Sequence, residues 1–384
     1  MQKEVYIYIG KNMKISKYDV TIGDIANLWS DDKTLKSKIS TLKIYDFEGK
    51  NETRIIISAL SLVKKIQEQE PDLILVTGDL LNLSEENILT QKRVVIEEFK
   101  QRCLNVPYGD MFHLMSALAY QVHPYRWPTI GLSTEDIENA SHQEITHFFH
   151  RHYAVNNLIL CVSGHVSFEQ AVSLCEKWFG DFQSVDLPPR NLPQEPAQTE
   201  PRFQRVRRKV PHNTISIMYH MCGRRHADYQ ACDMISDILS NGKSSRFFRN
   251  VMMKQNLFTE LDASISGTVD PGLLLVKAQL ADGVPFTKAQ KAIDDEISDF
   301  LRTGTTAYEM EKCANKFEST QLFSNITYQK KAVKLCEYEL LHQAADINLE
   351  VQKYRNLSVD SLMNVAQKLF NPNNRSILFY GPDA

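Results

Sequence analysis

The sequence has no long apolar run, no large excess of charge and no paired-cysteine motif. Its 384 residues carry a formal net charge of −3, which gives no general attraction to nucleic acid or to an anionic membrane. The longest apolar stretches, 55–63 and 273–276, are far shorter than the ~20 residues that a membrane helix needs. Residues 1–7 run directly into strand-like alternation, so we expect no signal peptide and no membrane segment.

The cysteines are scattered along the chain, and none forms a C-x-x-C pair. The seven are Cys103, Cys161, Cys175, Cys222, Cys232, Cys313 and Cys336. An odd, dispersed set in a chain of this size indicates reduced thiols rather than a disulfide framework or a thiolate metal site. The default location is therefore cytoplasmic. Hydrophobic residues make up 43% of the chain and charged residues 24%, as in ordinary globular proteins with two or three domains.

Residues 1–79 have the pattern of a small α/β module. Val5–Ile9 is rich in β-branched and aromatic residues and predicts a strand. Residues 20–26 predict a strand that turns into a helix at Asp24, and a helical period through residues 60–66 ends before Pro71. Residues 73–76 then predict another short strand.

This N-terminal stretch resembles the soluble N-terminal region of stage V sporulation protein AA. The residues that carry the resemblance are the run V-T-I-G-D-I-A at 20–26, Leu42–Tyr45, and I-I-I-S-A-L at 55–60 followed by Glu70-Pro71-Asp72. The resemblance covers this segment alone. It raises one possible role for the chain, that of a scaffold that acts through the N-terminal module.

From about residue 80, long helical patterns alternate with short strands. Capping boxes, in which a Ser or Thr caps a helix and a Glu or Gln three residues later caps back, are predicted at four places: Ser141/Glu144, Ser167/Gln170, Thr287/Gln290 and Thr306/Glu309. Residues 186–201 contain five prolines without periodicity, which predicts a linker between domains. The abrupt change near residue 80 indicates a gene fusion, a chimeric assembly or a mis-joined reading frame.

A repeat relates the two halves of this region. Paired asparagines open an apolar strand that reaches a glycine at the same offset in 156–164 and in 373–381, and each copy follows an aromatic-ended helix. The second copy has a long front portion from about 203 to 270, and nothing in residues 1–79 matches it. The repeat therefore predicts that the first copy lacks its front half.

Residues 82–384 resemble the pitrilysin/insulinase family of zinc peptidases, in the bacterial branch found in Bacteroides-like organisms. The matching blocks, in family order, are 91–99, 105–109, 123–131, the block that ends Trp178-Phe179-Gly180, and Gly242–Phe248. The resemblance implies an α/β (α+β) fold of truncated plus complete pitrilysin-like domains with antiparallel sheets and helices packed on one side. In this family, two such domains close around an extended peptide.

The resemblance implies a zinc site that this chain lacks. Family enzymes bind zinc through two histidines of an H-x-x-E-H helix and a distal Glu, and the open fourth position activates water. No H-x-x-E-H occurs among the eleven histidines. Glu98 takes the position of the third ligand, with Gln91 where the family usually has a second acid. We expect Glu98 to be an orphan ligand, solvated or ion-paired, and no zinc to be bound.

The substrate-contacting pair of the family is also substituted. Its Arg and Tyr, seven residues apart, steady the substrate and the transition state, and this chain has Met252 and Thr259 at those positions. A thioether donates no hydrogen bond to a scissile carbonyl. The chain alone is therefore predicted to be inactive as a peptidase.

Two other constellations favour structural interpretations. His142, His147, His150 and His152 lie on one predicted helix, but no carboxylate is spaced to complete a metal site, so at most adventitious metal binding is expected. The basic run from Arg202 to Lys209 alternates with Phe203 and Val206. This alternation predicts the first strand of the second domain, with a charged outer face, rather than a nucleic-acid site.

The sequence therefore predicts a module at 1–79, a truncated peptidase-like domain at 80–185, a linker at 186–201 and a complete peptidase-like domain at 202–384. The expected function is that of a non-catalytic partner or peptide-binding subunit. The alternative is an active zinc metalloendopeptidase completed by another chain. Expected partners are a peptide or protein, a second copy in a homo-oligomer, or a catalytic partner subunit.

Overall fold

The structure is a computed structural model that describes residues 3–9, 16–20, 83–163 and 167–382. The chain forms two compact units, each built from three separated segments. Unit 1 comprises 1–91, 140–189 and 319–350, and unit 2 comprises 92–139, 190–318 and 351–384. The four-part division expected from the sequence stays a prediction.

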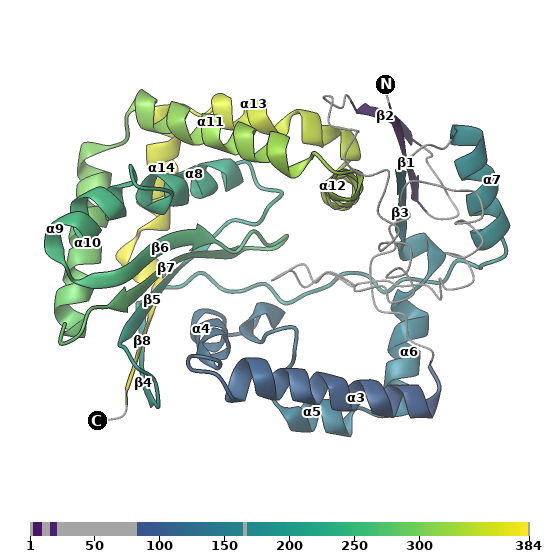
Figure 1. Cartoon of the computed structure of the whole chain (residues 1–384), viewed down its shortest axis with the longest axis horizontal. Coiled ribbons are helices and arrows are strands. Elements are labelled where there is room, and N and C mark those ends of the chain that lie inside the picture. The colour runs from purple at the N-terminus through teal and green to yellow at the C-terminus, as the bar shows by residue number, and fades with distance from the viewer. Residues whose placement is uncertain (1–2, 10–15, 21–82, 164–166, 383–384) are drawn as a thin grey trace, which may run out of the picture. The chain divides into compact units, whose positions relative to one another are not determined.

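Unit 1 contains a three-stranded antiparallel sheet in the order β2-β1-β3 (Figure 1). β1 spans Lys3–Ile9, β2 Ser16–Val20 and β3 Ile159–Ser163. The strand predicted at 5–9 is confirmed as part of β1, and the strand of the first Asn-Asn repeat as β3. β3 receives β1 as its neighbour, with Ile7 opposite Cys161. The N-terminal segment thus supplies strands to the sheet of the following region. The predictions for 21–79 lie outside the described residues.

Helix α12 (Tyr328–Leu341) packs on β3 in unit 1. Its Ala332 and Leu335 form a small core with Cys161 and with Ala344, which follows the helix. Helices α6 (His142–His152) and α7 (Phe168–Phe179) begin with the predicted capping boxes at Ser141 and Ser167. In both, the Ser side chain accepts the backbone N–H three residues on, and that residue's side chain accepts the N–H of the Ser.

Unit 2 is built on a five-stranded sheet in the order β4-β8-β5-β7-β6 (Figure 1). The strands are β4 (Arg202–Arg208), β5 (Thr214–Met221), β6 (Phe258–Ile265), β7 (Gly272–Leu280) and β8 (Arg375–Pro382). The expected antiparallel pairing holds for every pair except β4–β8, which is parallel. The sheet is therefore mixed. The basic run from 202 is confirmed as the strand β4.

Helices cover both faces of this sheet. The helices of residues 202–384 that pack on it lie on one face, as expected, and the other face is covered by a helix from residues 80–185. On one face the main core gathers around β5 and the helices α8 (Tyr229–Ser240), α10 (Phe286–Thr303) and α14 (Val359–Leu369). The other face is covered by α4 (Met111–Ala119), whose Met115 packs with Met218 of β5 and Leu378 of β8. Neighbouring residues of β5 belong to different cores because successive side chains of a strand point to opposite faces of the sheet.

The remaining α-helices and π-helical turns are α3 (Glu85–Phe99), the π-helical turns Lys100–Leu104 and Phe247–Met252, α5 (Thr134–Asn139), α9 (Met253–Gln255), α11 (Ala307–Ser324) and α13 (Glu350–Arg355). Short 3-10 helices lie at Pro124–Arg126, Val155–Asn157, Ala344–Asn348 and Pro372–Asn374. The capping box at Thr306/Glu309 is confirmed at the start of α11. The one at Thr287 is wrong, because α10 already begins at Phe286, after Pro285. Of the helices that the structure describes, none combines the length and apolar character needed to cross a bilayer.

Candidate functional site

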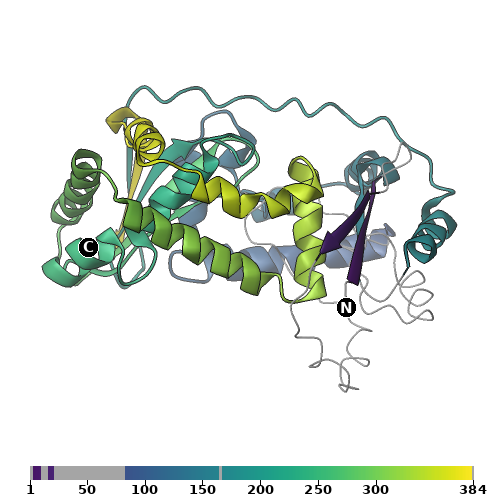
Figure 2. The same ribbon diagram turned by 90° about the horizontal axis from the view of Figure 1, so that it is seen from above.

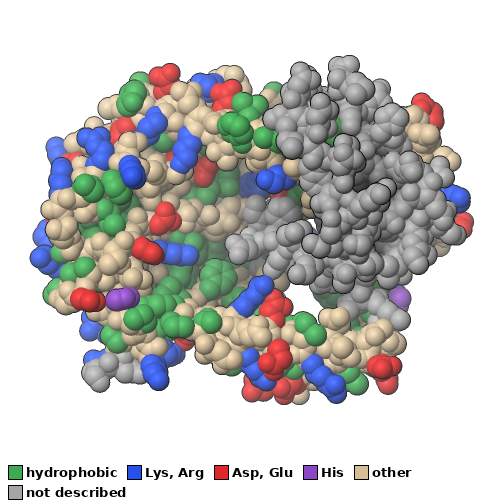
Figure 3. Space-filling view, viewed as in Figure 1, with side chains coloured by type: hydrophobic (Ala, Val, Ile, Leu, Met, Phe, Trp, Pro, Cys, Tyr) green, Lys and Arg blue, Asp and Glu red, His purple; other side chains and the backbone are tan. Residues whose placement is uncertain are grey.

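Glu98, the candidate third zinc ligand, lies near the end of α3 in an ion pair. Its carboxylate is 2.9 Å from the guanidinium of Arg102, four residues on, and both side chains are substantially exposed. Acidic and basic side chains are interspersed on the surface over α3 and α5 (Figure 3). Within the described residues, no three His, Cys, Asp or Glu side chains are grouped to hold a metal ion. The residues around Glu98 therefore do not fit a zinc centre, and its assignment as a ligand position stays a prediction.

Met252 and Thr259, at the positions of the family Arg and Tyr, lie on either side of a tight turn. Met252 ends the π-helical turn after α8 and packs, partly buried, against the main core. Thr259 is exposed on β6, where its hydroxyl donates to the carbonyl of Gln279 at 3.4 Å. Between them Asn256 adopts the left-handed conformation, with φ 50°. Met252 has no hydrogen-bond donor and the Thr259 hydroxyl is used within the sheet, so the assignment of the two residues to substrate contact stays a prediction.

Three of the four histidines of α6 make local contacts, and no metal-binding group is found among the described residues. His142 is hydrogen bonded to the carbonyl of Leu83 at 2.7 Å. The rings of His150 and His152 lie against Phe149 and Phe148. Burial, with Arg151 and His147 nearby, lowers the pKa of His152, which favours the neutral ring. His142, His147 and His150 are exposed and His152 is partly buried, so these imidazoles are surface side chains of the helix.

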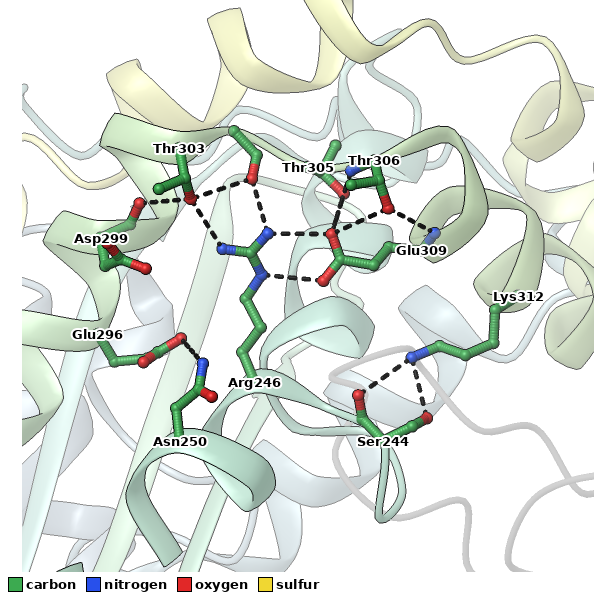
Figure 4. A network of polar contacts seen from close by, with 11 residues as sticks. Ser244, Arg246, Asn250, Glu296, Asp299, Thr303, Thr305, Thr306, Glu309 and Lys312 are labelled. Atoms are coloured by element: carbon green, nitrogen blue, oxygen red, sulfur yellow. Dashed lines mark hydrogen bonds and ion pairs between the residues drawn. The ribbon is translucent and has the colours of Figure 1, made fainter. Parts of the chain in front are cut away.

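Arg246 is the centre of a dense polar network in unit 2 (Figure 4). Its guanidinium donates two hydrogen bonds to the carboxylate of Glu309, at 3.0 and 2.9 Å, and one to the carbonyl of Gly304 at 2.6 Å. It also lies 4.9 Å from the centroid of the Phe300 ring. Arg246 belongs to the sequence block 242–248 that resembles the zinc peptidases. In this structure the block joins the turn after α8 to the α10–α11 corner.

Two glutamates of this network have opposite electrostatic surroundings. Burial would raise the pKa of Glu309, but the Arg246 guanidinium and the N–H of Thr306 outweigh burial and lower it. Glu296 is 7% exposed and accepts a hydrogen bond from Asn250 at 2.9 Å. Burial raises the pKa of Glu296 despite that bond. Both glutamates have protein partners, so this network is structural.

A second polar cluster in unit 2 fixes the proline-rich linker. The carboxylate of Glu195 accepts three successive backbone N–H groups, from Gln121 at 2.7 Å, Val122 at 2.9 Å and His123 at 3.0 Å. Burial opposes ionisation, but these three donors outweigh it and lower the pKa of Glu195. Figure 2 shows the linker, in teal, as an extended segment without helix or strand. From residue 190 onward it is therefore anchored, although nothing periodic in its sequence indicates this.

Asp270, at the tip of the β6–β7 hairpin, collects the other contacts of this linker cluster. Arg190 of the linker binds it with two hydrogen bonds, at 3.0 and 2.5 Å. The hydroxyl of Tyr125 donates to it at 3.2 Å, and the Nε2 of His123 lies 3.7 Å away. His123 is 4% exposed, and burial lowers its pKa despite the neighbouring Asp270. The block His123-Pro124-Tyr125, which carries part of the family resemblance, thus binds the hairpin tip.

The carboxyl end of α4 is tied to the sheet next to this cluster. Arg202 of β4 donates to the carbonyls of Leu118 and Ala119 at 3.2 and 2.7 Å. His220 of β5 is hydrogen bonded to the same Ala119 carbonyl at 2.9 Å. These side chains satisfy carbonyls that a helix leaves unpaired at its end. Arg202, at the start of the basic run, therefore works as a cap for the end of α4.

Family comparisons agree with the resemblance drawn from the sequence. Residues 139–317 match the family described as Peptidase M16 inactive domain, and residues 2–78 match stage V sporulation protein AA. The zinc protease PqqE of Helicobacter pylori is 26% identical over 312 residues, which cover 79% of this chain and 68% of the relative. A probable mitochondrial-processing peptidase subunit beta of Schizosaccharomyces pombe is 26% identical over 244 residues, which cover 56% and 51%.

Solved structures share the fold. A protease from Helicobacter pylori superposes with a TM-score of 0.72 at 24% identity, covering 80% of this chain and 73% of that one. The peptidase M16 inactive domain from Pseudomonas fluorescens gives a TM-score of 0.68 at 15% identity, covering 78% and 71%.

Residues 139–317 of the chain thus match the inactive domain of the M16 peptidases, and the fold is that of M16-like peptidases. The chain carries no catalytic zinc motif of its own in its 384 residues. Two of its relatives carry the name zinc protease.

Proposed function

We propose that this protein is a non-catalytic, peptide-binding partner subunit of the zinc-peptidase type. The observation that carries the proposal is the combination of the family fold with a ligand position, Glu98, that is paired to Arg102. Catalysis by this family's chemistry needs a metal with an open position for water. In this proposal, Glu98 occupies a zinc-ligand position without binding zinc. Met252 and Thr259 occupy the positions of the substrate-contacting pair without making its contacts.

The outer edge of β6 supports peptide binding. Among the described strands, β6 has β7 as its one neighbour. The N–H of Ser266 donates to the carbonyl of Leu273 at 2.9 Å, and hydrogen-bonded pairs alternate along an antiparallel ladder. The register therefore turns the backbone N–H and C=O groups of Leu261, Ala263 and Ile265 away from β7. Such an edge is suited to pairing with an extended peptide.

The free thiols fit a reducing compartment. All seven cysteines are unpaired by disulfides, as is usual in the cytoplasm. We infer a cytoplasmic protein whose partner is an extended polypeptide or a catalytic subunit of the same family.

The test combines metal content, cleavage and binding on the full chain. We expect far less than one zinc per chain by elemental analysis after dialysis against a weak chelator. We also expect no cleavage of oxidised insulin B chain by mass spectrometry, but saturable binding of the same peptide, labelled with fluorescein, by anisotropy. About one zinc per chain that is lost in Glu98→Ala, together with chelator-sensitive cleavage, would overturn the non-catalytic part of the proposal. Absence of peptide binding would overturn the other part.

A matched pair of variants locates the binding edge. Leu261→Pro removes one outward N–H without breaking a ladder bond to β7, because proline is tolerated on the solvent side of an edge strand. Leu261→Thr keeps the N–H and removes a similar amount of apolar packing. Binding should be lost in Leu261→Pro and kept in Leu261→Thr, with both melting curves cooperative. Equal binding by the two variants would place the peptide elsewhere.

A further inference from the structure

The second edge of the unit 2 sheet is the strand β4, whose one neighbour among the described strands is β8 (Figure 1). The direction of its backbone groups follows from the pairing across the sheet. The N–H of Leu280 donates to the carbonyl of Asn213 at 2.9 Å, so the backbone groups of Asn213 point toward β7 and those of the next residue, Thr214, toward β8. Thr214 lies opposite Tyr380. Tyr380 therefore points its backbone groups toward β5, and Phe379 points its own toward β4.

The parallel register of β4 and β8 then shows which backbone groups of β4 face outward. Arg205 lies opposite Phe379. In a parallel pair, a residue that points toward its neighbour bonds to the residues on either side of the opposite one. The backbone groups of Phe203, Arg205 and Arg207 therefore point away from β8. The carbonyl of Arg207 accepts the guanidinium of Arg208 at 2.9 Å, and the outward N–H groups are spaced by about 6.6 Å, the repeat of an extended strand.

A row of positive charge follows this edge. Arg205 and Arg207 are exposed, and the exposed Lys209 comes directly after the strand. Among the residues that the structure describes, no carboxylate is joined to any of the three. Arg208, whose side chain points to the other face of the sheet, differs from them because Asp110 binds it at 3.0 Å. The charge of the row is therefore available to a partner.

Arg205 is held in place by two aromatic rings. Its guanidinium lies 5.3 Å from the ring centroid of Phe286 and 5.6 Å from that of Phe379. The two rings contact each other, with centroids 5.3 Å apart. A guanidinium that stacks on aromatic rings keeps the N–H groups at its rim for a carboxylate, which it binds in a two-pronged geometry. Phe203, two residues earlier on the same face, has 55% of its side chain exposed.

Charged side chains on an edge strand have a general role, because they keep sheets from pairing edge to edge. That role explains why a basic or an apolar strand is kept away from β4. It does not explain an exposed aromatic ring at Phe203, beside an arginine that is already positioned. Since opposite charges stabilise cross-strand pairs and like charges destabilise them, the edge discriminates in favour of an acidic strand.

We propose that β4 is a docking edge for an acidic extended segment of a partner protein, which adds to the sheet as a further strand. Main-chain hydrogen bonds to the outward groups supply part of the affinity, and alternate side chains supply the specificity. Two acidic residues with one residue between them lie opposite Arg205 and Arg207, and an apolar residue lies opposite Phe203. This edge is at the other end of the sheet from β6, and it does not depend on whether β6 binds a peptide.

The test is fluorescence anisotropy on the full chain with labelled acidic peptides. The peptides carry the core Glu-Thr-Glu-Thr-Phe or its reverse, so that both strand directions are covered. We expect saturable binding of one of them that weakens as salt is raised, and no binding of the same peptides with Lys in place of Glu. Leu261→Pro should leave this binding unchanged, which separates it from peptide binding at β6. Absence of saturable binding by both acidic peptides would overturn the proposal.

Charge variants locate the contact on β4. Arg205→Gln and Arg207→Gln should each weaken binding about tenfold, the effect of losing one charge-assisted hydrogen-bonding contact. The control is Arg249→Gln, the same change at an exposed arginine in the π-helical turn before β6. It should change the dissociation constant by less than about twofold, because exposed charges at a distance are screened. Equal effects of the three substitutions would show a response to net charge alone and would refute the docking edge.

Strand addition is tested separately from charge. Arg207→Pro removes the outward N–H as well as the charge, at a position where an edge strand tolerates proline, so it should bind more weakly than Arg207→Gln. In the unaltered chain, the peptide should also slow hydrogen exchange of the Arg205 N–H. Equal binding by the two Arg207 variants, with unchanged exchange at Arg205, would refute strand addition. An oligothymidylate that displaces the peptide and binds both Arg207 variants equally would identify a polyanion site and overturn the proposal.

Discussion

Arg190 and Asp270 are joined by a two-pronged ion pair that fastens a proline-rich linker to a hairpin eighty residues away in sequence. The Asp270 side chain is 21% exposed and that of Arg190 53%, so the pair is partly screened by solvent. Its geometry is nevertheless specific, because a planar guanidinium matches a carboxylate. The same aspartate accepts a hydrogen bond from the hydroxyl of Tyr125. One residue therefore holds both the linker and the segment after α4.

The first prediction concerns this ion pair. A double-mutant cycle with Arg190→Gln and Asp270→Asn should give a coupling energy of about 1 kcal/mol at low salt, above the median for exposed pairs because the contact is bidentate. The measurement is urea unfolding of the four proteins. The coupling should fall in high salt, since charges at the surface are screened. Additive effects of the two substitutions would mean that the linker is not fastened here.

The second prediction concerns Glu195 and pH. The pKa of Glu195 is lowered in the folded protein, so its contribution to stability is present above the unfolded pKa and is lost as the pH falls through the folded pKa. Glu195→Gln should cost about 1–2 kcal/mol at neutral pH, because a charge-assisted acceptor of three N–H groups is replaced by a neutral one. Unfolding titrations between neutral and acidic pH should show the two proteins converging.

The control for Glu195 is a second glutamate of the same linker. Glu200 is exposed, and Glu200→Gln should change the free energy of unfolding by no more than about 0.5 kcal/mol. If both substitutions had equal effects, the loss would reflect net charge rather than the three backbone contacts.

Local motifs explain which elements could be predicted from the sequence. The boxes at Ser141, Ser167 and Thr306 each lie within four residues, so neighbouring side chains decide them. The box at Thr287 is wrong because Pro285, with its fixed φ, already starts the helix and leaves Thr287 in the first turn. Strands β1 and β4 follow from β-branched and alternating residues in the same local way.

Long-range contacts explain what the sequence did not predict. Glu195 meets its partners more than seventy residues away. The sequence predicts a truncated domain at 80–185, which stays a prediction, but it did not indicate that α4 covers the second face of the sheet of unit 2. No periodicity in the linker or in α4 indicates which surface each will contact. The candidates Glu98, Met252 and Thr259 came from family resemblance, and their roles still need the experiments above.

The third prediction contrasts two glutamates of the Arg246 network. The folded pKa of Glu296 is raised, so its ionisation costs stability as the pH rises above the unfolded pKa. Glu296→Gln keeps an acceptor for Asn250 and should stabilise the protein at neutral pH by up to about 1 kcal/mol. That gain should disappear at acidic pH, where the carboxyl is protonated in both states. The measurement is the free energy of unfolding as a function of pH.

Glu309 should behave in the opposite way. Its folded pKa is lowered, and Glu309→Gln leaves Arg246 with a weaker partner in a partly buried site. The loss should be about 2 kcal/mol at neutral pH and should shrink as the pH falls through the folded pKa. Two substitutions of identical chemistry would thus shift stability in opposite directions. If the stability changes of the two variants depended on pH in the same way, burial would not dominate at Glu296 and Arg246 would not dominate at Glu309.

The fourth prediction concerns Asn256, which separates Met252 from Thr259. Its left-handed conformation, with φ 50° and ψ 31°, ends α9 and turns the chain into β6. Asparagine tolerates this region better than alanine, and glycine tolerates it without steric cost. Asn256→Ala should therefore destabilise the protein by about 1 kcal/mol, whereas Asn256→Gly should be neutral or slightly stabilising. Thermal unfolding of the two variants measures the difference.

The same substitutions test how this turn supports the edge of β6. β6 has an irregular register between Phe258 and Glu260, directly after the turn. If Asn256 sets the start of β6, Asn256→Ala should weaken peptide binding at the Leu261 edge, and Asn256→Gly should preserve it. A destabilised Asn256→Ala with unchanged peptide affinity would mean that the register of β6 is fixed by its pairing with β7 alone. Equal stability of both variants would contradict the left-handed conformation itself, because only that conformation distinguishes alanine from glycine so strongly.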